Sequence, residues 1–148
     1  MRGSKSPGHS GHCVIYSDGG SRGNPGPAAA GGVVQRDDGS VVAKVREYLG
    51  VTTNNVAEYR ALLLLLQRAL DEGFQQVDVF TDSELVERQI NGPYRVKDEK
   101  LIPLHAAARR TLAKFGEWHV VHIPREKNKV ADKLVNAVLD EHAARSAQ

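Results

Sequence analysis

Four acidic residues lie at the ends of predicted structural elements, where they could bind a cation. Asp18 ends an apolar run and precedes the glycine- and proline-rich stretch GGSRGNPG. Asp82 closely follows a second apolar run, VDVF, and Glu58 and Asp132 each fall in the first turn of a predicted helix. Carboxylate oxygens suit hard divalent cations such as Mg²⁺ or Mn²⁺ rather than Zn²⁺. These side chains therefore predict a metal site, provided that the fold brings them together.

The predicted elements that carry these acids alternate between strands and helices. Three apolar stretches joined by short links predict an antiparallel meander of strands at residues 12–17, 28–36 and 41–49. A helix, a strand, two helices, a strand and a final helix follow at residues 56–72, 77–80, 83–90, 100–115, 118–123 and 128–144. This order, βββαβα(α)βα, predicts an α/β fold with a five-stranded mixed sheet and helices on both of its faces.

The order of the elements predicts that all four acids reach the same edge of the sheet. The first and third strands of a meander run the same way, and a right-handed crossover makes the fourth strand parallel to the first. The fifth strand is expected to be parallel as well, so the last helix begins at the edge where open α/β sheets bind ligands. Carboxylates packed together raise each other's pKa values, and bound cations remove that repulsion.

Each acid also has a simpler interpretation. Asn55 and Glu58 have the spacing of a helix capping box. Asp82 or Ser83 could cap the short helix that follows them, and single aspartates are common in turns and in the first turn of helices. The joint arrival of the four acids at one edge favours the metal site over these separate structural roles.

Composition and charge limit the class of protein. The chain has 148 residues, of which 41% are hydrophobic and 26% charged, as in one soluble globular domain. A net charge of +2 permits a nucleic-acid partner without requiring one. Neither a membrane-spanning run nor a signal peptide is found, so we expect a cytoplasmic monomer without a membrane partner.

Cys13, the single cysteine, is expected to be buried and reduced. We predict a flexible tail at 1–11, a domain at 12–144 and a C-terminal tail at 145–148.

Four segments, in order between about residues 12 and 142, resemble type 1 ribonuclease H: YSDGGSRGNPGPAAAGGVV, TTNNVAEYRAL, VFTDSELV and REKNKVADKLVNAV. The resemblance implies the ribonuclease H-like fold. It also implies an endoribonuclease that hydrolyses the RNA strand of RNA–DNA hybrids by two-metal-ion catalysis and leaves 5′-phosphate and 3′-hydroxyl ends. The implied cofactor is Mg²⁺, two ions with substrate bound, and Mn²⁺ is an alternative. Two metal ions can stabilise both the attacking and the leaving oxygen of such a displacement.

The resemblance also implies roles for individual residues. Asp18 would bridge both ions, Asp132 would hold the ion that activates water, and Glu58 and Asp82 would hold the ion at the leaving oxygen. The implied substrate-binding residues are Gly19, Gly20, Asn24, Thr53, Asn54, Asn55 and Ser83. Asparagine side chains and backbone amides can hydrogen-bond to 2′-hydroxyls, by which a protein distinguishes RNA from DNA.

The chain departs from many bacterial members of the family in two places. They carry a histidine in the loop before the last catalytic aspartate, whereas the loop here, PREKNKVAD, has none. Arg125 is the candidate for its role, because an archaeal-like branch of the family has an arginine there, and Glu126 is the alternative. The chain also lacks the basic, aromatic-rich protrusion of those members, so we expect modest, salt-sensitive affinity.

Two other functions stay open on the sequence alone. One is a non-catalytic module that binds RNA–DNA hybrids or double-stranded RNA on the same fold. The other is a structure-specific DNA nuclease of the wider superfamily. Double-stranded RNA also stays open as a second substrate of a catalytic protein.

Overall fold

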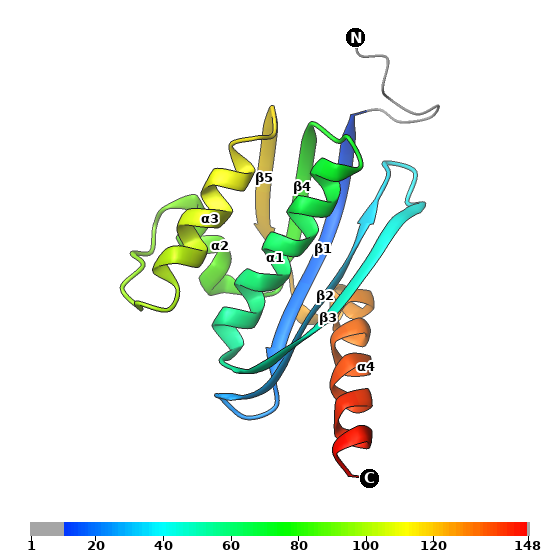
Figure 1. Ribbon diagram of the computed structural model, residues 1–148. Coiled ribbons are helices and arrows are strands. Elements are labelled where there is room, and N and C mark those ends of the chain that lie inside the picture. The colour runs from blue at the N-terminus through cyan, green and yellow to red at the C-terminus, as the bar shows by residue number, and fades with distance from the viewer. Residues whose placement is uncertain (1–10, 148) are drawn as a thin grey trace.

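The computed structural model describes residues 11–147 (Figure 1), and residues 1–10 of the predicted N-terminal tail lie outside them. Five strands form one sheet in the order β3-β2-β1-β4-β5. The strands are β1 (His12–Ser21), β2 (Gly26–Gln35), β3 (Val41–Thr52), β4 (Gln76–Thr81) and β5 (Glu117–His122). The helices are α1 (Asn54–Asp71), α2 (Glu84–Asn91), α3 (Ile102–Leu112) and α4 (Lys129–Ser146), and a short 3-10 helix, η1 (Arg125–Lys127), precedes α4.

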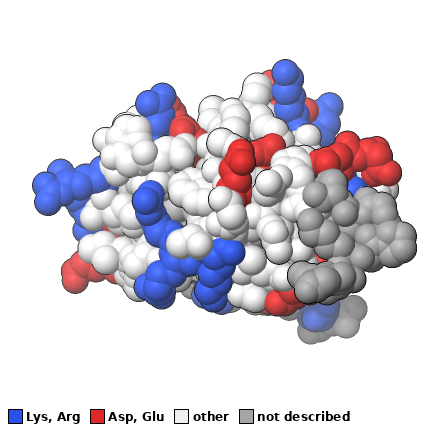
Figure 2. Space-filling view, turned by 90° about the horizontal axis from the view of Figure 1, so that it is seen from above, with Lys and Arg blue, Asp and Glu red and all other residues white. Residues whose placement is uncertain are grey.

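The strand directions confirm the predicted topology. β1 pairs with β2, and β2 with β3, in antiparallel fashion, whereas β4 is parallel to both β1 and β5. The carboxyl ends of β1, β4 and β5 therefore lie at one end of the sheet. Figure 2 views the opposite end, where β1 begins and where basic and acidic side chains are interspersed.

Helices cover both faces of the sheet, as predicted (Figure 1). The neighbouring residues Gly31 and Gly32 of β2 face opposite sides, because successive residues of a strand alternate in direction. A Cβ atom added to Gly31 would lie 3.1 Å from Leu134 Cβ of α4, and one added to Gly32 would lie 2.4 Å from Leu65 Cδ1 of α1. The small residues of β2 thus let a helix approach closely on each face.

Two hydrophobic clusters of unequal size hold these layers together. The larger one joins α1, α2 and α3 to the sheet and contains Ile15, Val79 and Leu66; Cys13 is buried in it, as predicted. The smaller one lies under α4 and consists of Ala29, Val135, Val138 and Leu139, with Tyr48 packed against it. In residues 11–147, no helix is both long enough and apolar enough to cross a bilayer.

Several predicted boundaries differ from the structure. β1 continues through Asp18, Gly19 and Gly20 to Ser21, because these residues pair with Ala28 to Gly31 of β2. The chain turns only after Ser21, where Arg22 N donates to Pro27 O over 2.8 Å. The helix predicted at 100–115 spans only Ile102–Leu112. α4 reaches Ser146, so the predicted C-terminal tail begins two residues too early.

Candidate active site

Asp18 and Asp82 are neighbours because of the register between β1 and β4. The last parallel pair of these strands is Ser17 with Thr81, so the next residue of each chain segment is an aspartate. Asp18 is 6% exposed and lies inside β1, whereas Asp82 stands between the end of β4 and the start of α2. The first strand was predicted to end at residue 17, before Asp18; Asp18 is instead held in an extended strand at the point where the neighbouring strand β4 stops.

Glu58 reaches Asp18 from the second turn of α1, because α1 packs very closely on β1. A Cβ atom on Gly19 would lie 2.2 Å from Ala57 O, so only glycine permits this approach. Gly19 N donates a hydrogen bond of 3.0 Å to Glu58 Oε1. The capping-box interpretation of Glu58 is wrong, because the cap of α1 is Thr53, whose Oγ1 accepts a hydrogen bond from Val56 N.

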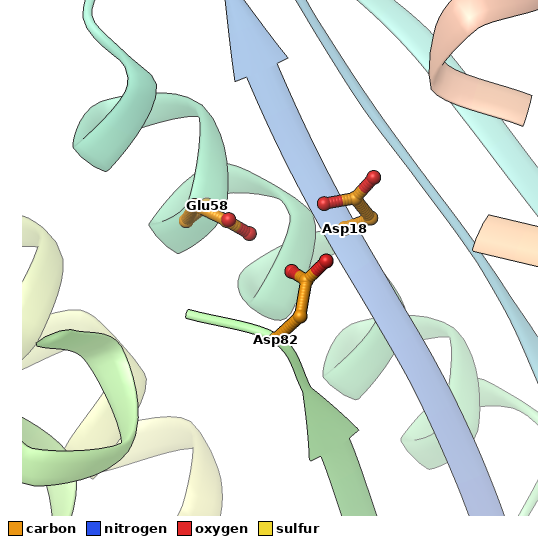
Figure 3. Close-up of side chains that lie close together, drawn as sticks. All are labelled: Asp18, Glu58 and Asp82. Carbon is orange, nitrogen blue, oxygen red and sulfur yellow. The ribbon is translucent and has the colours of Figure 1, made fainter. Parts of the chain in front are cut away.

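Asp18, Glu58 and Asp82 form a compact cluster of carboxylates (Figure 3), with one oxygen of each within 4.8 Å of the others. Burial, followed by the negative charges of Asp82 and Asp132, raises the pKa of Asp18 to about 8. Burial also raises the pKa of Glu58, and the charges of Asp18 and Asp82 raise it further. Burial raises the pKa of Asp82 as well. An oxygen-only cluster with this repulsion fits a hard divalent cation.

Asp132 lies beside this cluster rather than inside it. It occupies the first turn of α4 and lines the same cleft as the other three acids. Its carboxylate is 32% exposed and stands 3.6 Å from Arg125 Nη2. The charge of Asp132 raises the pKa of both Asp18 and Asp82, so Asp132 acts electrostatically on the cluster from beside it.

Arg125 also lines the cleft, whereas Glu126 lines a separate pocket with Tyr16 and Lys127. The Arg125 side chain is 80% exposed. Its positive charge opposes the upward shift of the pKa of both Glu58 and Asp82. Of the two candidates in this loop, Arg125 is therefore the one that acts electrostatically on the carboxylates.

The predicted substrate-binding residues divide into two groups. The cleft has a volume of about 480 Å³, and Gly19, Gly20, Asn54 and Asn55 line it. Among the described residues, those that line the cleft do not include the other three predicted residues, Asn24, Thr53 and Ser83. Thr53 and Ser83 accept hydrogen bonds from Val56 N and Val86 N as helix caps, which is the simpler interpretation of Ser83.

Asn24 and Asn54 connect the turn after β1 to the start of α1. Asn24 Oδ1 accepts a hydrogen bond of 3.0 Å from Asn54 N, and Asn54 Oδ1 accepts one of 2.8 Å from Ser21 N. Both side-chain oxygens thus already accept hydrogen bonds from backbone N–H groups of the protein. Asn24 acts from outside the cleft by fixing the loop that borders it.

Several cleft residues carried no signal in the sequence. Arg22 lines the cleft and donates to Asp140 Oδ1 over 2.7 Å, and Asn136 of α4 lies beside it. Their positions depend on α4 packing across β1 and β2, which no local pattern specifies. Val135 and Leu139 of α4 also border the cleft. In place of a protrusion, residues 92–101 form an irregular connection between α2 and α3.

Comparisons with known proteins match this fold over most of the chain. A family model described as reverse transcriptase-like matches residues 16–138. A ribonuclease HI of the archaeon Halobacterium salinarum is 43% identical over 135 residues, which cover 91% of this chain and 68% of that protein. The crystal structure of RNase H1 from this archaeon has a TM-score of 0.85 and covers 88% of this chain and 98% of its own.

Two further solved structures are similar. The N-terminal RNase H domain of a Mycobacterium tuberculosis protein has a TM-score of 0.88 at 41% identity and covers 93% of this chain and 99% of that chain. The present chain spans only 37% of that bifunctional protein. LC11-RNase H1, in complex with an RNA/DNA hybrid, has a TM-score of 0.84 at 41% identity and covers 88% and 99% of the two chains. The family match, these identities and the shared fold show that the chain belongs to the type 1 ribonuclease H family.

Proposed function

We propose that this protein is an endoribonuclease that hydrolyses the RNA strand of RNA–DNA hybrids in a metal-dependent reaction. The observation that carries the proposal is the carboxylate cluster of buried Asp18 and half-buried Glu58 and Asp82, with Asp132 at its border. The hybrid bound to a relative with 41% identity supports this substrate class. Cleavage would leave 5′-phosphate and 3′-hydroxyl ends.

The residues present fit a pair of Mg²⁺ ions, with Mn²⁺ as an alternative. The donors are all carboxylate oxygens, and among the described residues that line the cleft only Arg22 and Arg125 are cationic. When bound, two such ions would activate a water molecule and stabilise the charge on the leaving oxygen. Burial and repulsion between the carboxylates raise the pKa values of Asp18 and Glu58, and a divalent cation would offset both effects.

Each carboxylate has a role that follows from its position. Asp18 interacts electrostatically with Asp82, Asp132 and Glu58, and we infer that it would contact both ions. Asp132, more exposed and next to Arg125, would hold the ion on the solvent side, where water enters. Glu58 and Asp82 would hold the ion next to the leaving oxygen.

The cleft also offers groups that could select RNA. Gly20 and Asn55 line it together with the acids, and a Cβ atom added to Gly20 would approach Asn54 Oδ1 and Val135 Cγ1 no closer than 3.9 Å. A sugar–phosphate backbone can then approach β1 closely, and polar groups on α1 can hydrogen-bond to 2′-hydroxyls. Arg125 would stabilise the negative charge that the scissile phosphate adds to the cluster.

We also propose that the protein acts as a cytoplasmic monomer, which sedimentation and cell fractionation can test.

The proposal is tested with three labelled duplexes of one sequence: an RNA–DNA hybrid, double-stranded RNA and double-stranded DNA. We expect rapid cleavage of the hybrid's RNA strand with Mg²⁺ and none with EDTA. Asp82→Asn should abolish cleavage, whereas Asp71→Asn, on the exposed end of α1, should not. Binding of the hybrid without cleavage in Mg²⁺ or Mn²⁺ would favour a non-catalytic module. Equal cleavage of the DNA duplex would favour a DNA nuclease.

A further inference from the structure

Asn128 is a buried polar residue at the junction of β1 and α4, outside the set of metal ligands. Its side chain is 1% exposed, and its Nδ2 donates a hydrogen bond of 2.9 Å to the backbone oxygen of Ser17. Its own backbone oxygen accepts a hydrogen bond of 3.1 Å from Asp132 N. Ser17 directly precedes Asp18, so one residue connects the backbones that carry two of the four acids.

The side chain of Asn128 hydrogen-bonds to Ser17 instead of capping the helix. Asn128 is the N-cap residue of α4, where an asparagine oxygen normally accepts a hydrogen bond from the first turn of the helix, but it makes no such bond. Its Oδ1 is buried and has no hydrogen-bond partner among the described residues. Both features disfavour folding. A local preference that is broken in this way is typical of a site where geometry matters for function.

We propose that Asn128 is a positioning residue that sets the separation between Asp18 and Asp132, and with it the metal-binding geometry. This inference rests on the proposed metal-dependent function. The acids come from opposite ends of the chain, and the larger apolar contacts of α4 lie further along the helix, at Val135, Val138 and Leu139. In the first turn only the small side chain of Ala131 is buried, whereas Val130 is 50% exposed. The hydrogen bond from Asn128 therefore holds the part of α4 that carries Asp132.

The test replaces Asn128 with serine, because serine caps helices well but is too short to reach the Ser17 carbonyl. The variant thus keeps the helix start and removes the connection to β1. Asn91→Ser is the control for loss of such a hydrogen bond at a more exposed site: Asn91 Nδ2 also donates a hydrogen bond of 2.9 Å to a strand carbonyl, that of Val120, away from the cleft. For each protein we would measure thermal unfolding in EDTA, Mn²⁺ binding by calorimetry without substrate, and kcat and KM for the hybrid.

We expect both variants to unfold at similar temperatures. Asn128→Ser should bind Mn²⁺ about tenfold or more weakly and lose kcat by a similar factor, with KM within about twofold, as is typical when a group that orients metal ligands is removed. Asn91→Ser should match the wild-type protein in metal affinity and in kcat.

Two results would overturn the proposal. One is unchanged Mn²⁺ affinity and kcat in folded Asn128→Ser, which would leave Asn128 a purely structural role. The other is a rise in KM alone, which would make Asn128 a substrate contact. If Asn128→Ser does not fold, Asn128→Thr keeps more of the volume and the same cap and is judged by the same criteria. Failure of the wild-type protein to bind Mn²⁺ and to cleave would instead refute the proposed function.

Discussion

Asp18→Asn should stabilise the metal-free protein, even though it should abolish catalysis. Asp18 is 6% exposed, and its pKa is raised from 3.8 to about 8 by burial and by the charges of Asp82 and Asp132. The native state therefore binds this proton more tightly than the unfolded chain does. Stability falls as the pH rises from about 4 to about 8, because the unfolded state gives up its proton more easily over that range. Asparagine has no charge to bury, so the variant should not lose this stability as the pH rises.

The size of the effect follows from the pKa shift. Each pKa unit corresponds to about 1.4 kcal/mol. Since about three units lie between the unfolded pKa of 3.8 and neutral pH, the upper bound at pH 7 is about 4 kcal/mol. The carboxylates can turn apart and attract monovalent cations, so we expect Asp18→Asn to gain about 2–4 kcal/mol at pH 7 and almost nothing at pH 4.

The assay is urea unfolding in EDTA at several pH values, followed by circular dichroism. Asp71→Asn, which alters an exposed aspartate at the end of α1, should change stability by less than about 0.5 kcal/mol. Added Mg²⁺ should stabilise the wild-type protein, because it binds only the native state, but should have little effect on Asp18→Asn. The reasoning is refuted if Asp18→Asn is no more stable than the wild-type protein at pH 7, or if its gain is equally large at pH 4.

Three further perturbations test other parts of the structure. Gly32→Ala should lower the free energy of unfolding by about 1–3 kcal/mol, measured with urea, because its Cβ would lie 2.2 Å from the backbone oxygen of Tyr16 and 2.4 Å from Leu65 Cδ1. Arg125→Ala should reduce cleavage of the hybrid about tenfold at pH 7, whereas Arg125→Lys should retain most of it, since a cation there opposes the raised pKa values of Glu58 and Asp82. Hybrid affinity in Ca²⁺, measured by filter binding, should fall steeply with salt, with a slope close to 0.7–0.9 per phosphate contacted; a flat salt response would contradict binding through the phosphate backbone.

The convergence of the acids could be predicted because it depends on topology. The order of strands and helices, with one handedness rule, determines which ends of the elements meet. Asp18 and Asp82 are adjacent for this reason, since β1 and β4 are parallel and in register up to Ser17 and Thr81. That argument needs only the type and direction of each element. Apolar patterns indicate the type, and the order of the elements with the handedness rule gives the direction.

Contacts between distant segments could not be predicted in the same way. The glycines after Asp18 favour a turn by their local preference, but pairing with β2 extends the strand to Ser21. Gly19 is required by its contact with Ala57, and Asn128 reaches Ser17 across 111 positions of sequence. Local patterns describe what a residue favours by itself, whereas these roles are determined by the surface that packs against it.

The small cluster under α4 has a consequence for how the protein loses activity on heating. The buried residues of this cluster are Ala29, Val135, Val138 and Leu139, far fewer than those that join α1 to the other face. Segments with little buried apolar surface detach in subglobal opening reactions at a lower free energy than the whole domain. Detachment of α4 would remove Asp132 and leave Asp18, Glu58 and Asp82 in place. Heat inactivation should therefore begin below the temperature at which the sheet melts, and amide hydrogens of α4 should exchange with solvent before those of α1.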